Sequence, residues 1–291
     1  MKLSGYSKEA RQRREALALW IIRGLAGFVL LILAFVMGYI IVNGIGAVDW
    51  SFLSTFPTDS MTGGGIWPAI VGTACLSVGS MAISLPLGFG AAIYLTDYAK
   101  PGHLVNFVRL GVANLAGVPS VVFGLFGLSL FVSTFGFGRS LLSGCLTLGL
   151  LTLPTVTAAA EESLRQTPMS FREAALALGA NRWQAVRQVI LPAAIPGMLT
   201  GAILALGRAA GETASIMLTA VTAYTPRLPD SVFNEVMALA THVFNLATNG
   251  GRISETKPQQ FGTALVLLVL VLSLSLIAVV IRTRLRKNRK W

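Results

Sequence analysis

The chain has 291 residues, of which 54% are hydrophobic and 12% charged, and its formal net charge is +11. Soluble domains carry about a quarter charged residues, so this composition excludes an ordinary water-soluble enzyme or binding domain. The basic residues lie mostly at the two ends and in short loops between apolar blocks, which indicates membrane topology rather than nucleic-acid binding.

Six apolar segments are long enough to cross a hydrocarbon core about 30 Å thick, which takes about 20 helical residues. They are residues 19–43, 67–96, 110–133, 140–160, 193–223 and 262–282. The first segment follows a basic tail, 1–18, but it is too long for a signal peptide and lacks a cleavage site, so it is predicted to remain as an anchor. The predicted fold is an all-α polytopic membrane protein with about six transmembrane helices.

Lys and Arg favour the cytoplasmic side of a membrane, and six crossings place both ends on one side. The tail 1–18 and the tail 283–291 are both basic, whereas residues 44–66 contain no Lys or Arg. We therefore expect both termini in the cytoplasm.

The third segment contains the sequence Gly117-Val-Pro-Ser120. Pro119 removes a backbone donor and leaves nearby carbonyls free. A helix that restarts at Ser120 would point amide groups and a positive dipole end toward a translocation path, as anion sites often require. A simple kink is an equally good interpretation.

Residues 161–192, between the fourth and fifth segments, are too polar to cross the bilayer and read as helix. Pro168 and Ser170 suit a helix start, and Gly179 suits a C-terminal cap. A second short helix is expected from Arg182 to Ile190. On physical grounds alone this is either a docking surface for a partner's groove or a helical connector between two spans.

Arg208 and Glu212 are predicted to lie near the centre of the fifth span, where each charge costs about 2.5–3.5 kcal/mol. Their spacing places them on one helix face, so they either neutralise each other as packing or receive a polar substrate. In the second interpretation Arg208 offers a fixed charge and a planar donor fork for a tetrahedral oxyanion. Thr213, Ser215 and Thr219 continue the polar side, although such hydroxyls often bond to their own backbone.

The polar loop resembles a known motif. The pattern consists of Glu173, Ala174, Ala175, Gly179, Leu191 and Pro192, with Val189 where Ile is usual. It is similar to the EAA loop of ABC importer permeases. The resemblance implies a type I importer permease of the bacterial inner membrane with a domain over 67–282, in which the loop 161–192 forms coupling helices that dock into a nucleotide-binding subunit.

Further segments narrow the resemblance. They are Gly207-Arg-Ala-Ala-Gly-Glu-Thr-Ala214, Gly117-Val-Pro-Ser-Val-Val-Phe-Gly-Leu125 and Leu85-Pro-Leu-Gly-Phe-Gly-Ala-Ala-Ile-Tyr-Leu95. Together they are similar to the phosphate-specific permeases, and the chain's size and short first periplasmic loop resemble the PstA type. The resemblance implies a substrate pathway that includes Arg208 and Glu212. Thr213, Ser215, Pro119 and Ser120 are the other pathway candidates.

The same resemblance implies the partners. They are a PstC-like second permease, two copies of a PstB-like ATP-binding subunit, a periplasmic phosphate-binding protein, inorganic phosphate and the lipid bilayer. The chain lacks a phosphate-cradling G-x-x-x-x-G-K-[ST] loop, so no cofactor is expected on it and ATP is expected to be used by the partner.

No catalytic or metal site is predicted. Cys75 and Cys145 lie in apolar runs without CxxC or His companions, and His103 and His242 stand alone at expected loop positions. Two other functions remain open at this stage. One is a permease for another oxyanion, such as sulfate, molybdate or phosphonate, and the other is a membrane component whose main role is to signal phosphate status.

Overall fold

The computed structural model describes residues 8–58, 63–100, 102–225, 227–248 and 253–287. In the first quarter of the chain the elements are α1 (Lys8–Gly44), the 3-10 helix η1 (Ile45–Ala47), α2 (Trp50–Ser54), β1 (Pro57–Thr58) and β2 (Gly63–Gly64). They are followed by α3 (Trp67–Ile93), the π-helix η3 (Tyr94–Tyr98), α4 (His103–Ala116), α5 (Ser120–Gly127) and the π-helix η4 (Leu128–Thr134). The remaining elements are α6 (Leu141–Arg165), α7 (Met169–Ala177), α8 (Arg182–Ala185), the π-helix η5 (Val186–Ile190), α9 (Leu191–Gly211), α10 (Ala214–Thr219), α11 (Leu239–Thr248) and α12 (Ile253–Lys287).

The predicted all-α polytopic fold is confirmed. Within the described residues, five helices are long and apolar enough to cross a membrane, and the bent pair α4–α5 makes a sixth when it is counted as one span. The outer two helices extend into the tails, because α1 already begins at Lys8 and α12 continues to Lys287. The two short strands pair antiparallel between α2 and α3.

The third predicted span, 110–133, is wrong as a continuous helix. The chain bends by 102° between α4 and α5. Pro119 has φ −57° and ψ 140°, so the backbone leaves the helical region there and a new helix begins at Ser120. Proline has no N–H to continue the α4 ladder, and its fixed φ suits a helix start. Of the two interpretations of Pro119, the helix restart is confirmed.

The fifth predicted span, 193–223, is wrong at both ends. One helical segment runs from Arg182 through η5 and α9 to Gly211. The second short helix expected in the polar loop is therefore the start of this span. Pro192 does not interrupt this segment. It follows directly after the π-helix η5, where the regular α-helical hydrogen bonds are already replaced, so the N–H that proline lacks is not needed there. The segment stops at Glu212, whose ψ of 138° is extended.

The centre of the fold is the packing of α3 along α6 and α9. α3 turns a row of buried hydroxyl residues inward: Thr73, Ser77, Ser80 and Ser84. Thr73 donates its hydroxyl to the Ala69 carbonyl and Ser80 donates to the Ser77 carbonyl. Small side chains that satisfy their hydroxyls within the helix allow two membrane helices to approach closely.

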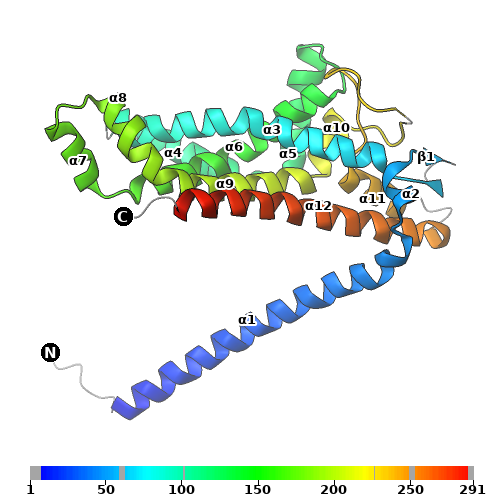
Figure 1. The fold of residues 1–291 in the computed structure, drawn as a ribbon, viewed down its shortest axis with the longest axis horizontal. Coiled ribbons are helices and arrows are strands. Elements are labelled where there is room, and N and C mark those ends of the chain that lie inside the picture. Colours follow the sequence, from blue (N-terminus) through cyan, green and yellow to red (C-terminus); the bar gives the residue numbers. More distant parts are fainter. Residues whose placement is uncertain (1–7, 59–62, 101, 226, 249–252, 288–291) are drawn as a thin grey trace.

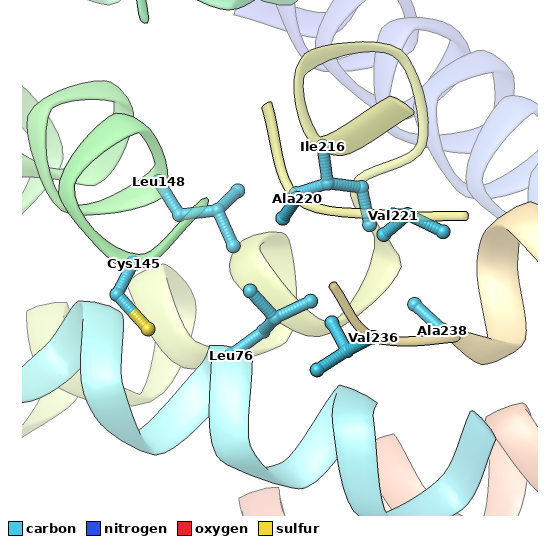
Figure 2. Packing of buried hydrophobic residues seen from close by; sticks show 8 residues of the cluster. All are labelled: Leu76, Cys145, Leu148, Ile216, Ala220, Val221, Val236 and Ala238. Carbon is cyan, nitrogen blue, oxygen red and sulfur yellow. The ribbon is translucent and has the colours of Figure 1, made fainter. Parts of the chain in front are cut away.

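A buried apolar cluster joins distant parts of the chain (Figure 2). Leu76 of α3 meets Leu148 of α6 and Ile216 of α10, and Val236 packs on them from the segment before α11. Residues 236–239, which belong to no motif in the sequence, thus contribute to the core. His103 and His242 are not loop residues, since they lie in α4 and α11.

The helix α1 diverges from the rest of the molecule (Figure 1). It is attached near its end, where Tyr39 stacks edge-on against Phe261 of α12 with ring centroids 5.5 Å apart. The start of α1, the end of α12 and the pair α7–α8 all lie toward one end of the long axis, and α2 and β1 lie toward the other (Figure 1). The molecule therefore has two distinct ends.

Candidate functional site

Arg208 and Glu212 lie where α9 ends. Arg208 occupies the last turn of α9, and Glu212 is the residue at which the helix stops. The Nε of Arg208 is 3.9 Å from the Oε1 of Glu212, and the two side chains are 34% and 12% exposed. The expectation that both residues lie near the centre of a continuous span is therefore wrong. Gly211 and Thr213, which both have low helix propensity, flank the residue at which the helix stops.

The helices α5 and α10 run side by side in the same direction. A Cβ added at Gly124 of α5 would lie 2.9 Å from the Cα of Ser215, and one added at Gly127 would lie 3.0 Å from the Cγ2 of Thr219. In both contacts a residue of α5 lies beside the residue about 91 positions later in the chain. By the same spacing, Ser120 at the start of α5 lies level with the residues around Glu212. Two helix starts therefore lie side by side next to the end of α9.

Helix starts carry amide groups without intrahelical partners and a partial positive charge. The starts of α5 and α10 thus lie level with each other, and α10 begins three residues after Gly211, where α9 ends. Arg208 and Glu212 form a pair of opposite charges at this end of α9, with Nε and Oε1 3.9 Å apart. The sequence-predicted residues Pro119, Ser120 and Thr213 are brought together here because Pro119 and Thr213 immediately precede the two helices.

The pathway candidates differ in accessibility. Pro119 is exposed, and Ser120 and Thr213 are half-buried. Ser215 is fully buried, and in the described part of the chain its hydroxyl has no hydrogen-bond partner. Thr219 bonds back to the Ser215 carbonyl at 3.0 Å. Ser215 and Thr219 therefore face α5 rather than an open surface.

The second functional surface is the turn between α7 and α8. The Ala180 amide donates to the Ala175 carbonyl at 3.1 Å, and the Gly179 amide donates to the Leu176 carbonyl at 3.0 Å. This pair of bonds is a Schellman motif, and Gly179 adopts the left-handed φ of 85° that the motif requires. The side chain of Asn181 then accepts from the Gln184 amide in a capping box that starts α8.

Large apolar side chains are exposed on this surface. They are Met169, Leu176, Leu178 and Trp183, and Leu178 is 89% exposed. Exposed apolar side chains gathered on a polar connection mark a protein-interaction site. Sequence reasoning missed Leu178 and Trp183. Both could have been recognised in the sequence as large apolar residues in the short polar stretch between α7 and η5.

The predicted coupling residues divide into two sets. Glu173, Ala174 and Gly179 are exposed on the surface of α7 and its turn. Ala175 is buried, and Leu191 and Pro192 are half-buried at the start of α9. The first set is available to a partner, whereas the second set fixes α7 and the turn to the transmembrane helix.

No group of three or more His, Cys, Asp or Glu side chains is placed to hold a metal ion within the ranges that the structure describes. The end of α9 carries the charged pair of Arg208 and Glu212, just before the start of α10. The surface of α7 and α8 has the character of a docking surface.

Residues 84–290 match a protein family described as the binding-protein-dependent transport system inner membrane component. A probable ABC transporter permease protein of Bacillus subtilis, YqgI, is 35% identical over 237 residues, which are 77% of this chain and 80% of that protein. The phosphate transport system permease protein PstA 1 of Mycobacterium tuberculosis (strain H37Rv) is 37% identical over 175 residues, which are 60% of this chain and 56% of that protein.

The fold is similar to those of solved ABC transporters. A chain of a bacterial transporter for the import of the acidic polysaccharide alginate superposes with a TM-score of 0.64 at 16% identity. The superposition covers 94% of this chain and 96% of that one. At this identity the similarity concerns the fold alone.

Proposed function

The chain belongs to the family of binding-protein-dependent transport system inner membrane components and is a permease subunit of an ABC importer, and from this premise we propose that its substrate is inorganic phosphate. The 37% identity to a phosphate transport permease supports this substrate. The motif around Arg208 and Glu212 supports it as well.

The charged residues at the end of α9 carry the proposal. An oxyanion needs charge and several donors that converge on it: Arg208 supplies the charge and a donor fork, and the start of α5 at Ser120 supplies backbone amides. Glu212 orients the guanidinium and accepts a hydrogen bond from a protonated oxygen of the anion. A monobasic phosphate has such a hydroxyl, whereas sulfate at neutral pH has none. The acceptor therefore favours phosphate among tetrahedral anions.

The partners follow from the family and from the two surfaces. A periplasmic phosphate-binding protein delivers the anion, and a second, PstC-like permease covers the Arg208 side, which is partly exposed in the single chain. Two PstB-like subunits bind and hydrolyse ATP, and one of them receives α7 together with the exposed Leu178 that follows it and Trp183 of α8. ATP acts through the difference in the partner's affinity for two permease conformations. This chain itself binds no cofactor.

The test is uptake of labelled phosphate by vesicles that contain the whole transporter. We expect Arg208→Gln to lower uptake at least about tenfold, because a charge-assisted hydrogen bond contributes about 1.5–3 kcal/mol. Arg208→Lys keeps the charge without the fork and should fall between the two.

The matched control is Arg284→Gln, which removes an exposed arginine near the end of α12. It should transport like the wild type. Wild-type uptake by Arg208→Gln would contradict the role of the site. Wild-type uptake that sulfate, molybdate or phosphonate suppresses as well as phosphate does would contradict the substrate.

A further inference from the structure

A buried ion pair connects the coupling helix α7 to the end of α3. Arg172 of α7 donates from Nη2 to Oδ1 of Asp97, a residue of the π-helix η3 that continues α3. The Asp97 side chain is only 4% exposed, and that of Arg172 is 26% exposed. A carboxylate this deeply buried is strongly destabilising without a cationic partner, so Arg172 is constrained to stay beside it.

A second arginine holds the same turn of η3 from the other side. Arg109 of α4 donates from Nη2 to the Leu95 carbonyl at 2.9 Å and from Nε to Glu161 of α6 at 2.6 Å. The end of α3 is therefore joined to α4, α6 and α7 within three residues. The π-helical turn leaves carbonyls out of the regular ladder, which makes the Leu95 carbonyl available to a side chain.

The surroundings of the pair leave room for movement. Asp97 and Arg172 line a cavity of about 200 Å³, together with Arg182 of α8 and apolar residues of η5. The Oδ2 of Asp97 is buried without a hydrogen-bond partner in the described part of the chain. The charged contact thus lies beside open space rather than in a close-packed core.

The backbone of α7 packs on α8 and η5, which lead into α9. Movement of α7 therefore reaches α9 through the chain itself. The ion pair adds a direct connection to α3, and α3 packs along α6 over most of its length. Two of the central helices would then move with the docking surface instead of one.

We propose that Asp97 and Arg172 form a tether that transmits the movement of α7 to α3, and that they act as positioning residues for the ATP-driven step. This inference rests on the proposed function. The pair lies on α7 and η3, not at the end of α9 where the anion is proposed to bind, and its cavity borders Leu176 of the docking surface. Its loss should therefore separate ATP hydrolysis from transport without abolishing either assembly or hydrolysis.

The test is the ratio of phosphate transported to ATP hydrolysed by the complete transporter in vesicles. The variant Asp97→Asn with Arg172→Gln removes both charges and leaves no unpaired charge buried, so the fold is retained. We expect it to assemble and to hydrolyse ATP within about twofold of the wild-type rate. The ratio should fall at least about fivefold, as for a lost coupling free energy of about 1 kcal/mol.

A charge-retaining variant gives the matched comparison. Asp97→Glu with Arg172→Lys keeps both charges and should recover at least half of the wild-type ratio. Arg284→Gln removes an exposed arginine of α12 and should leave the ratio unchanged. A pair that served only as packing would affect assembly and thermal stability but not the ratio among assembled complexes.

Two results overturn the tether: a wild-type ratio in the doubly neutral variant, or its failure to assemble, which would make the pair a requirement of folding. The wild-type complex separates this inference from the proposed function. If the wild type hydrolyses ATP but carries no phosphate, the substrate is wrong. If the wild type carries phosphate and the neutral variant does so at the same ratio, only the tether is wrong.

Discussion

His242 is a fully buried imidazole in α11, outside the candidate membrane spans. Burial disfavours the charged form and lowers its pKa from 6.5 to about 4. The folded chain therefore keeps His242 neutral at pH values where the unfolded chain has already bound a proton. Stability from this residue is complete above about pH 6.5 and is lost as the pH falls toward 4.

The unfolding free energy of the chain should therefore depend on pH through His242. Between pH 7.5 and pH 5 the wild-type chain should lose about 2 kcal/mol of unfolding free energy through His242. His242→Gln has no titrating group and should lose less over the same interval. Thermal unfolding of the purified chain in detergent at the two pH values measures the difference. An equal loss in both proteins would contradict a neutral His242 in the folded state.

The pairing of Arg208 with Glu212 shows what residue spacing predicts well. Two opposite charges four positions apart in an apolar segment were expected to meet, and they lie 3.9 Å apart. Their depth was not predictable in the same way, because hydropathy does not show that a helix ends between them. The sequence does not indicate Asp97 as the partner of Arg172, because 75 residues separate the two.

The turn between α7 and α8 sets the shape of the docking surface at the scale of elements. Gly179 has φ 85°, and a Cβ added there would meet nothing within 4 Å. The requirement for glycine in the isolated chain is thus conformational and not steric. A side chain at this position would point into the space that the ATPase occupies in the proposed complex.

Substitutions at Gly179 separate the two requirements. Asn adopts the left-handed conformation more readily than other non-glycine residues, whereas Val does not. We expect Gly179→Val to uncouple ATP hydrolysis from phosphate uptake and Gly179→Asn to retain at least half of the wild-type uptake. The measurement is uptake per ATP in vesicles. Unchanged phosphate accumulation in Gly179→Val would contradict a role for this turn, and equal loss in both would indicate a steric limit set by the partner.

Elements with strong local signals were predictable, and elements made by tertiary packing were not. Residues 170–179 combine strong helix formers with a terminal glycine, and α7 with its Schellman turn lies there. The helix α11 escaped prediction because its polar residues, Thr241 and His242, are buried by α3 and α12 rather than exposed. The division of the third span depended on Pro119, whose two interpretations only the backbone geometry separates.

The arrangement of the whole molecule agrees with an even number of membrane crossings, which places the start of α1 and the end of α12 on the same side of the membrane. α7 and α8, the start of α1 and the end of α12 gather at one end of the long axis (Figure 1). If ATPase subunits dock on α7, this end faces the cytoplasm. The hairpin of β1 and β2, with α2, then faces the periplasm.

Cysteine labelling in intact cells tests this orientation. Ser54 is the last residue of α2, Arg284 lies in the last turn of α12, and both are exposed. α2 and the end of α12 lie toward opposite ends of the long axis (Figure 1). Ser54→Cys should react with a membrane-impermeant maleimide in intact cells, whereas Arg284→Cys should react only after lysis. The parent chain, whose Cys75 and Cys145 lie within membrane helices, gives the background. Labelling of Arg284→Cys in intact cells would place the C-terminal end outside.

The isolation of α1 has a consequence for how the protein is made. None of the residues in its most apolar 18-residue window is buried by the rest of the chain, and a helix satisfies its backbone hydrogen bonds internally. α1 precedes the other membrane helices in the chain and is synthesised before them. It can therefore enter the bilayer and hold the nascent chain at the membrane while α3, α6 and α9, which partly bury one another, are still being synthesised.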